Sequence, residues 1–171
     1  VAIPVGKDSM SMQTRWRDGA AEHAVISPVS LIVSAFVHVP DVRHALTPLL
    51  RLDRGPTRLL WLDLSAGRLR LGASALAQVY GQLGNDAPDV DDPARLAKFL
   101  ATVRELALDR TLLAYHDLGD GGLFATLAEM SLAARCGLDV TLPEGATALA
   151  TLFAEELGAV VQVGAVDAAR V

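Results

Sequence analysis

The junction between a strand and a helix in this chain reads Tyr115-His116-Asp117-Leu118-Gly119-Asp120-Gly121-Gly122-Leu123. The apolar run at 111–115 indicates a buried strand before it, and apolar residues recur at helical spacing behind it, at positions 123, 127, 130 and 134. Two carboxylates therefore lie beside backbone N–H groups that open a helix. A turn of this kind can bind phosphate directly or through a metal ion.

Strand-like and helix-like segments alternate on both sides of this junction. Strands are predicted at 59–64, 111–115, 138–142 and 159–163, and helices at 73–83, 93–109, 121–136 and 147–156. Asp92 and Pro93 are expected to begin the second helix, and Gly137 to end the third. The alternation predicts an α/β (α+β) fold, a layered sheet with flanking helices on one side or on both. The direction of the strands is left open.

The sequence before Pro40 has a different character. Residues 1–5 are strand-like, residues 6–12 form a polar loop, and residues 13–24 predict an exposed hairpin or loop. Residues 29–39 alternate β-branched and small side chains, which predicts a strand with one buried face. We place a domain boundary near Pro40. The chain opens and stops inside apparent elements, so we expect a piece of a longer protein; a complete small protein with a trimmed tag is the alternative.

Composition limits the class of protein. The chain has 171 residues, 51% of them hydrophobic, and a net charge of −5. No basic patch is visible, so nucleic acid is not an expected partner. No apolar run approaches the roughly 18 residues of a membrane span, so no membrane is expected either. The single cysteine, Cys136, allows no internal disulfide and suits a reducing compartment. We expect it to be a packed thiol rather than a nucleophile.

The first candidate site is the junction itself. Asp117 ends the strand and is not needed as a helix cap, so it is the candidate ligand for Mg²⁺, which takes few carboxylates and keeps waters and phosphate oxygens. Asp120 is interpreted as the cap of the following helix. Gly121 and Gly122 form either a phosphate-binding corner or a close-packing turn. His116 is interpreted as a structural hydrogen-bonding residue rather than a base.

Two further groups are weaker candidates. Gly6-Lys7-Asp8-Ser9 combines a glycine, a cation and a hydroxyl, which suits phosphate, although an ordinary solvated turn has the same residues and the P-loop spacing is absent. Glu155 and Glu156 are predicted to end a helix, where negative charge opposes the macrodipole at a cost of roughly 0.3–1 kcal/mol. A nearby cation or metal would compensate, and a solvated helix end is the alternative.

Seven stretches together resemble phosphoribosylformylglycinamidine synthase (FGAM synthetase), the large multidomain enzyme family of de novo purine synthesis. The matching stretches are 6–12, 27–31, 71–80, 88–90, 113–117, 120–123 and 152–160. Their order and spacing agree from end to end. No single stretch is specific, but the set is.

The resemblance implies a fragment. The synthetase region of this family resembles a duplicated aminoimidazole ribonucleotide synthetase, with alternating A-type and B-type units. Residues 1–39 resemble the tail of the second A-type unit with a linker strand. Residues 40–171 resemble the second B-type unit, similar to the C-terminal domain of aminoimidazole ribonucleotide synthetase and truncated at its end. The glutaminase domain, with its own cysteine nucleophile, would lie further on, so Cys136 is not that nucleophile.

The resemblance also implies a reaction. Such enzymes convert formylglycinamide ribonucleotide, glutamine and ATP to formylglycinamidine ribonucleotide, glutamate, ADP and phosphate. The implied cofactors are Mg²⁺ and ATP or ADP. The implied partners are that ribonucleotide and the remaining synthetase and glutaminase domains, in the cytoplasm. The isolated fragment is expected to be inactive, because a site of this type depends on the proximity of all its parts.

Site residues are implied position by position. Gly6 and Ser9 resemble the loop that meets nucleotide and substrate, and Lys7 falls where smaller relatives carry a metal-binding asparagine. Glu156 falls where the related B-type unit of the active site has a substrate-contacting glutamate.

The junction resembles the second nucleotide site, which is auxiliary and structural in large members. Asp117 resembles its Mg²⁺ ligand, and Gly121 and Gly122 resemble its nucleotide-binding corner. Gly119 replaces a serine that contacts the nucleotide in close relatives, so only a backbone contact remains there.

Two other classes are considered. The unit can be a non-catalytic scaffold that packs against other domains, with a structural nucleotide site or none, and it can self-associate through the strand at 29–39. A dinucleotide-binding oxidoreductase is disfavoured because no Gly-x-Gly-x-x-Gly follows a strand.

Overall fold

The computed structural model describes residues 2–4, 6, 12–27, 33–145 and 147–171. Contacts within the chain divide it into two compact units, Val1–Pro40 and Asp41–Val171. Each unit is described by itself.

The first unit contains an antiparallel hairpin of β1 (Met12–Asp18) and β2 (Ala21–Ser27). Trp16 stacks on the opposite His23 with ring centroids 5.2 Å apart, and Arg17 pairs with Glu22 at 2.6 Å. The exposed hairpin expected at 13–24 is confirmed. The strand expected at 29–39 is wrong for residues 33–39, which have no regular structure and are exposed. Alternation alone forms no strand where no neighbour in the described part of the chain accepts its backbone hydrogen bonds.

The second unit is built on a three-stranded antiparallel sheet in the order β3-β5-β4. Its strands are β3 (Thr57–Asp63), β4 (Leu112–Asp117) and β5 (Gly158–Gly164). The strands predicted at 59–64, 111–115 and 159–163 are therefore confirmed, and their directions are now known. Residues 159–163 of the central strand are all buried, as expected of a strand covered on both faces.

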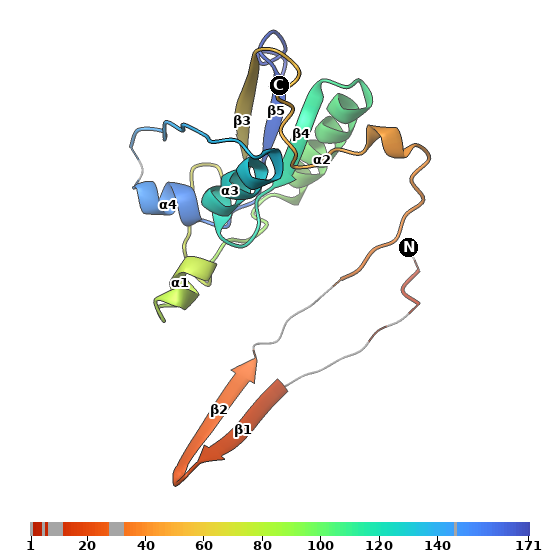
Figure 1. Cartoon of the computed structure of the whole chain (residues 1–171). Coiled ribbons are helices and arrows are strands. Elements are labelled where there is room, and N and C mark those ends of the chain that lie inside the picture. The colour runs from red at the N-terminus through yellow and green to blue at the C-terminus, as the bar shows by residue number, and fades with distance from the viewer. Residues whose placement is uncertain (1, 5, 7–11, 28–32, 146) are drawn as a thin grey trace. The chain divides into compact units, whose positions relative to one another are not determined.

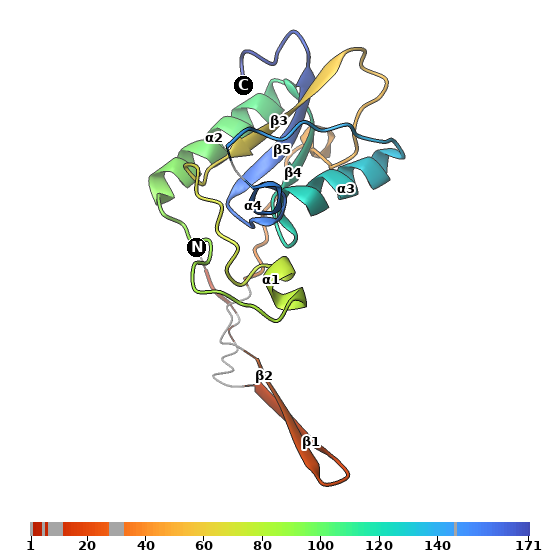
Figure 2. The ribbon, with the colours of Figure 1, turned by 90° about the vertical axis from the view of Figure 1, so that its left-hand side faces the viewer.

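Two helices cover opposite faces of this sheet, as Figures 1 and 2 show. One face packs on α2 (Pro93–Leu108) through a cluster that includes Leu106, Val161 and Val163. The other face packs on α3 (Gly122–Ala134) through a cluster that includes Met130 and Val160. The layered α+β fold expected from the sequence is confirmed, and of the two arrangements left open the structure has a helix on each side of the sheet.

A bulge in β4 allows this strand to serve both faces. Its register with β5 shifts between Leu112 and Ala114, so one extra residue interrupts the alternation. Leu112 and Tyr115 then belong to the cluster on the α2 side, and Ala114 to the cluster on the α3 side.

The start of α2 follows from its capping residues. The carboxylate of Asp92 accepts hydrogen bonds from the backbone N–H groups of Ala94 and Arg95, both at 3.0 Å, and Pro93 occupies the first helical position. This cap was predicted and is confirmed.

Three expected elements differ from the structure. Helix α1 (Ala75–Val79) is shorter than the predicted 73–83, because Ala73 has a φ of 59° and Gly81 a φ of 64°, values that no helix accepts. Helix α3 ends because Arg135, not Gly137, takes the left-handed conformation, with a φ of 54°. Helix α4 (Ala148–Phe153) ends three residues before the predicted position 156.

The strand predicted at 138–142 does not form in the described part of the chain. Residues 138–143 line a groove with Leu59, Trp61 and Leu127. The alternating apolar side chains therefore lie over the face of the sheet that carries α3. A segment in that place cannot join the hydrogen-bond ladder at an edge.

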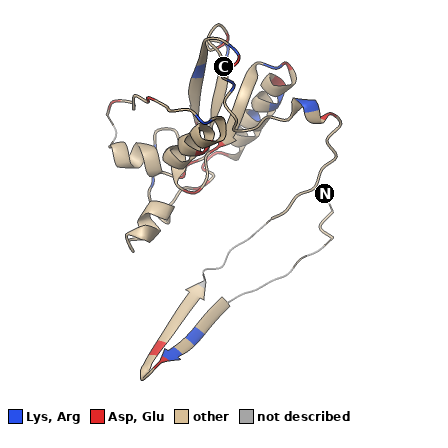
Figure 3. Ribbon diagram, viewed as in Figure 1, with Lys and Arg blue, Asp and Glu red and all other residues tan. Residues whose placement is uncertain are grey.

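A short turn leads into the second unit, the 3₁₀-helix η1 (Val42–His44), which Asp41 caps. Basic and acidic residues are interspersed along the ribbon in Figure 3. No helix among the described residues is long and apolar enough to cross a membrane.

Candidate functional site

Asp117 is the last residue of β4, and its side chain is 75% exposed. The neighbouring backbone is well fixed, because the Asp117 carbonyl accepts a hydrogen bond from the Thr126 hydroxyl at 3.3 Å and the Leu118 N–H donates to the Gly158 carbonyl at 3.0 Å. An exposed carboxylate thus projects from a fixed strand end at the start of α3. One such carboxylate fits the donor set that Mg²⁺ accepts together with waters and phosphate oxygens.

His116 ties this strand end to α3. Its Nε2 lies 2.6 Å from Oε2 of Glu129, and its Nδ1 lies 3.6 Å from Oδ1 of Asp117. The ring is only 20% exposed. The histidine therefore has the structural hydrogen bond expected of it, and it holds the base of the Asp117 side chain in place.

The glycine corner is shaped by packing. Gly121, with a φ of 83°, is the N-cap residue of α3, so the cap predicted at Asp120 is wrong. Gly122 has a φ of 61°, and a Cβ added there would lie 2.6 Å from the Ala154 carbonyl oxygen and 2.9 Å from that of Leu152. The close approach to the end of α4 is by itself sufficient to require a glycine at position 122. Close packing therefore accounts for the glycine at 122, and a phosphate-binding role of the corner stays a prediction. Gly119 is exposed, and a Cβ added there would have no other atom within 4 Å.

Glu155 supplies the cap that Asp120 does not. Its Oε1 accepts hydrogen bonds from the backbone N–H groups of Gly121 and Ala75, both at 2.7 Å. Because α4 ends at Phe153, neither Glu155 nor Glu156 lies at a helix C-terminus, and the predicted conflict with the macrodipole is wrong. The charge of Glu155 lies at the N-terminus of α3, where it is favourable.

Glu156 is 3% exposed and pairs with Arg70, which is 8% exposed. The Arg70 guanidinium donates to Oε1 from Nε and to Oε2 from Nη2, both at 2.7 Å, and the Arg70 backbone N–H donates to Oε1 at 3.0 Å. These hydrogen bonds raise the pKa of Arg70. A buried pair of this kind is stable only because both partners are present.

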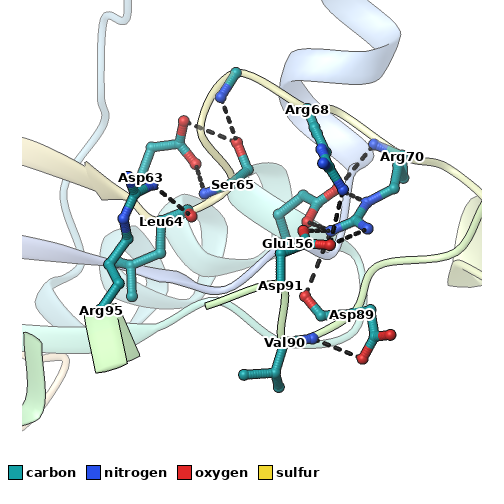
Figure 4. Close-up of polar contacts among 11 residues, drawn as sticks. Asp63, Leu64, Ser65, Arg68, Arg70, Asp89, Val90, Asp91, Arg95 and Glu156 are labelled. Carbon is teal, nitrogen blue, oxygen red and sulfur yellow. Dashed lines mark hydrogen bonds and ion pairs between the residues drawn. The ribbon is translucent and has the colours of Figure 1, made fainter. Parts of the chain in front are cut away.

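Further charges extend this pair toward the surface, as Figure 4 shows. Asp91 accepts from Nη2 of Arg70 at 2.8 Å and from Nη1 of Arg68 at 2.7 Å. Arg68, Asp91 and Arg95 border a cavity of about 120 Å³, whose wall includes Glu156. Within the described residues, the Arg95 side chain has no ion pair, and its Nη1 donates a 3.4 Å hydrogen bond to the Leu64 carbonyl.

The structure brings together only some of the expected site residues. Asp117, Gly119, Gly121 and Gly122 lie in one turn, with Glu155 against it. Gly6 is exposed in the first unit, and Lys7 and Ser9 lie outside the described residues. In the part of the chain that the structure describes, no three His, Cys, Asp or Glu side chains converge as a metal site. The assignments of Asp117 to a metal and of Glu156 to substrate stay predictions.

Two roles were missed from the sequence. Arg70 alternates with leucines in Arg68-Leu69-Arg70-Leu71, and the sequence does not separate this buried arginine from the exposed Arg68 two residues before it. The hydrogen bonds of Glu155 to two helix starts have no signal in the sequence, because the donors are backbone groups far away along the chain.

Cys136 is half-buried beside the core cluster on the α3 side, as expected of a packed thiol.

An antiparallel sheet between two helices, with an acidic strand end and a glycine corner, defines an α+β domain. Residues 59–170, about two thirds of the chain, match the AIR synthase related protein, C-terminal domain, and the chain belongs to this family. Residues 1–38 match the FGAR-AT PurM_N-like domain. Both domains are typical of FGAM synthetase, so the resemblance to that family is confirmed and the chain is consistent with a fragment of such an enzyme. At the level of the family, the function is that of an ATP-utilising, ligase-type enzyme of purine biosynthesis.

Proposed function

We propose that this chain is part of the second half of the synthetase region of a cytoplasmic phosphoribosylformylglycinamidine synthase, in which residues 1–39 end an A-type unit and residues 40–171 form most of a B-type unit. The complete enzyme converts formylglycinamide ribonucleotide, glutamine and ATP to the amidine, glutamate, ADP and phosphate. Two family matches in the order expected of this enzyme support the assignment. The partners are the remaining synthetase and glutaminase domains.

The observation that carries the site is the exposed Asp117 carboxylate at a rigid strand end. In our proposal Asp117 binds Mg²⁺ and the 119–122 corner borders the polyphosphate of ATP or ADP. When bound, the metal neutralises phosphate charge, and its other positions are filled by water and phosphate oxygens. Gly119 offers the ligand only its backbone.

The other residues position this group. His116, held by Glu129 at 2.6 Å, limits the directions in which Asp117 can point. Gly122 fixes the corner against the end of α4. Gly6 and Ser9 are assigned to nucleotide and substrate in the complete enzyme, and Glu156 to substrate through the cavity that it borders.

Calorimetric titration of the 171-residue chain with ADP and excess Mg²⁺ tests the nucleotide site. We expect binding by the wild type and a loss of roughly tenfold or more in Asp117→Asn, which removes one charge at the metal. Asp139→Asn is the matched control, because it removes the same charge from an exposed carboxylate that borders a different groove. Equal affinity in Asp117→Asn and the wild type would remove Asp117 from the site.

The isolated chain is expected to form no amidine from ATP, glutamine and formylglycinamide ribonucleotide. Most of the nucleotide-binding A-type units are missing, and the rate of such a reaction depends on the joint placement of all groups. Chromatographic detection of the amidine above the rate of a protein-free blank would contradict this expectation.

A non-catalytic scaffold is the alternative function, and specific contacts favour it. Both oxygens of Glu156 are bound by Arg70, and the Gly121 N–H is bound by Glu155. In addition, α3 exposes Phe124 at 53% and Leu132 at 76%, side chains that another domain could cover. Absence of any ADP binding in the titration above, with the fold intact by circular dichroism, would favour the scaffold.

A further inference from the structure

A second pocket lies at the end of the sheet where β3 and β4 begin and β5 ends. Gly164 lines this pocket, whereas Asp117 pairs with Ala159 toward the other end of β5. Gly164 and Ala159 are five residues apart, which at about 3.3 Å per residue separates the two places by roughly 17 Å. The pocket has a volume of about 380 Å³, which is enough for a small organic molecule.

Two arginines that line this pocket have little charge compensation within the described part of the chain. Arg110 forms no ion pair there. Arg54 lies 3.7 Å from Asp53, but that carboxylate is already bound by Arg51 at 2.7 Å. Asp167 is the one carboxylate in the lining, so the lining keeps a net charge of +1 on a chain whose net charge is −5. Guanidinium groups gathered in this way attract an anion.

The backbone holds Arg110 at the pocket at a cost. Its φ is 62°, a left-handed conformation that costs a residue with a side chain roughly 1–2 kcal/mol. The neighbouring turn keeps it there, because the Asp109 carboxylate accepts from the Thr111 N–H at 3.1 Å and from the Thr111 hydroxyl at 2.6 Å. Strain that the surrounding structure maintains in this way is common at ligand sites.

The rest of the lining is mostly apolar and includes Pro56, Leu113 and Val166. A bare inorganic ion would leave these side chains against water, whereas an ion with an apolar body would cover them. The two oxygens of a carboxylate are satisfied by one guanidinium group, but the three oxygens of a phosphate group can accept from two guanidinium groups at once. The lining therefore suits a phosphate group attached to an apolar body.

We propose that this pocket binds a small phosphate monoester, with the phosphate group between Arg54 and Arg110 and the apolar part of the ester over Leu113 and Val166. The site is separate from the nucleotide site proposed above and does not depend on it.

The experiment is a calorimetric titration of the 171-residue chain with phenyl phosphate. Arg110→Gly removes one guanidinium group and suits the left-handed backbone, so the fold is retained, and Arg110→Lys keeps the charge. Arg54→Gln removes the other guanidinium group, and Asp167→Asn removes the opposing carboxylate. Arg58→Gln is the matched control, because this exposed arginine lies in the same end of β3 but borders a different groove.

The signs of these changes identify an anion site. A unit charge about 4 Å from a phosphate oxygen, at an effective dielectric constant of about 60, changes affinity by about tenfold. We expect a wild-type dissociation constant below about 1 mM, about tenfold weaker binding in Arg110→Gly and in Arg54→Gln, and tighter binding in Asp167→Asn. Arg110→Lys and Arg58→Gln should stay within about threefold of the wild type. Inorganic phosphate should bind more weakly than phenyl phosphate, because it leaves the apolar wall uncovered.

Four results would overturn the proposal. The wild type fails to bind phenyl phosphate at about 10 mM, or the losses in Arg110→Gly and Arg54→Gln are no larger than that in Arg58→Gln. Inorganic phosphate binds as tightly as the ester, which removes the apolar part of the assignment. Asp117→Asn abolishes the binding of phenyl phosphate, which assigns the ester to the 119–122 corner. Absence of Mg·ADP binding while phenyl phosphate still binds would instead overturn the nucleotide site alone and leave this pocket standing.

Discussion

At the scale of single residues, the glycine corner has two kinds of glycine. Gly122 has no room for a side chain, since its added Cβ would lie within 3 Å of two carbonyl oxygens of the α4 end. Gly119 has open space around it. A ligand role and a packing role would both select glycine, and only the surroundings separate them. Packing accounts for Gly122 without any ligand, whereas nothing in the structure requires a glycine at 119.

Gly122→Ala should destabilise the chain by about 3 kcal/mol. About 1–2 kcal/mol comes from the left-handed backbone, and the rest from overpacking against Ala154 and Leu152. Urea unfolding followed by circular dichroism measures this change. Gly119→Ala is the control and should shift stability by less than about 0.5 kcal/mol. Similar costs at both positions would contradict the packing explanation.

Glu156→Ala should lower the melting temperature by about 10 °C, because it leaves the Arg70 guanidinium buried without its main partner. Arg68→Ala removes an exposed member of the same network, 57% exposed, and should lower it by no more than about 2 °C. Differential scanning fluorimetry measures both. A small change in Glu156→Ala would mean that Asp91 alone suffices to hold Arg70.

At the scale of elements, sequence patterns succeeded where the signal is local. Asp92 and Pro93 define the start of α2 through bonds to their immediate neighbours, so the sequence contains all that is needed. The strand expected at 138–142 is wrong because residues 138–143 lie over a face of the sheet, with Leu138 and Val140 still exposed, a placement that depends on where α3 lies. For the same reason Asp117 and the corner were found as a group, whereas the hydrogen bonds of Glu155 to Ala75 and Gly121 were not.

The turn between α2 and β4 gives a prediction about pH. Hydrogen bonds from Thr111, and further the contact with Arg170, hold the pKa of Asp109 below its usual value. A lowered folded pKa means that Asp109 contributes stability above about pH 4, where the unfolded carboxyl is ionised, and that this contribution is lost as the pH falls through the folded pKa. Asp109→Asn should therefore melt below the wild type at pH 7, and the two curves should converge as the pH falls below the folded pKa of Asp109. Melting temperatures between pH 2.5 and 7 measure this, with Asp139→Asn as a control; a constant difference across that range would refute it.

At the scale of the whole molecule, the two units differ in what stabilises their folded structure. The second unit has clusters of buried residues on both faces of its sheet, and all their members lie between Leu46 and Ala168. The first unit has a hairpin whose β1 residues are all exposed. A two-stranded hairpin is marginally stable in water, so the hairpin needs more than its own two strands for independent stability. The fold class was predictable because the second unit contains its own core, whereas the first unit offered only a pattern whose partners are not within the described residues.

Removing residues 1–40 should therefore leave the folding of the second unit intact. Neither core cluster includes a residue of the first unit, so the chain 41–171 should unfold in one cooperative transition within about 3 °C of the full chain. Scanning calorimetry of both chains measures this, and the Mg·ADP titration on the shorter chain adds a functional readout.

The Asp117 corner lies wholly in the second unit, so its contribution to binding should persist, and any loss of affinity would measure what residues 1–40, including Gly6 and Ser9, add. A shorter chain that fails to fold cooperatively would show that the first unit is an integral part of the domain.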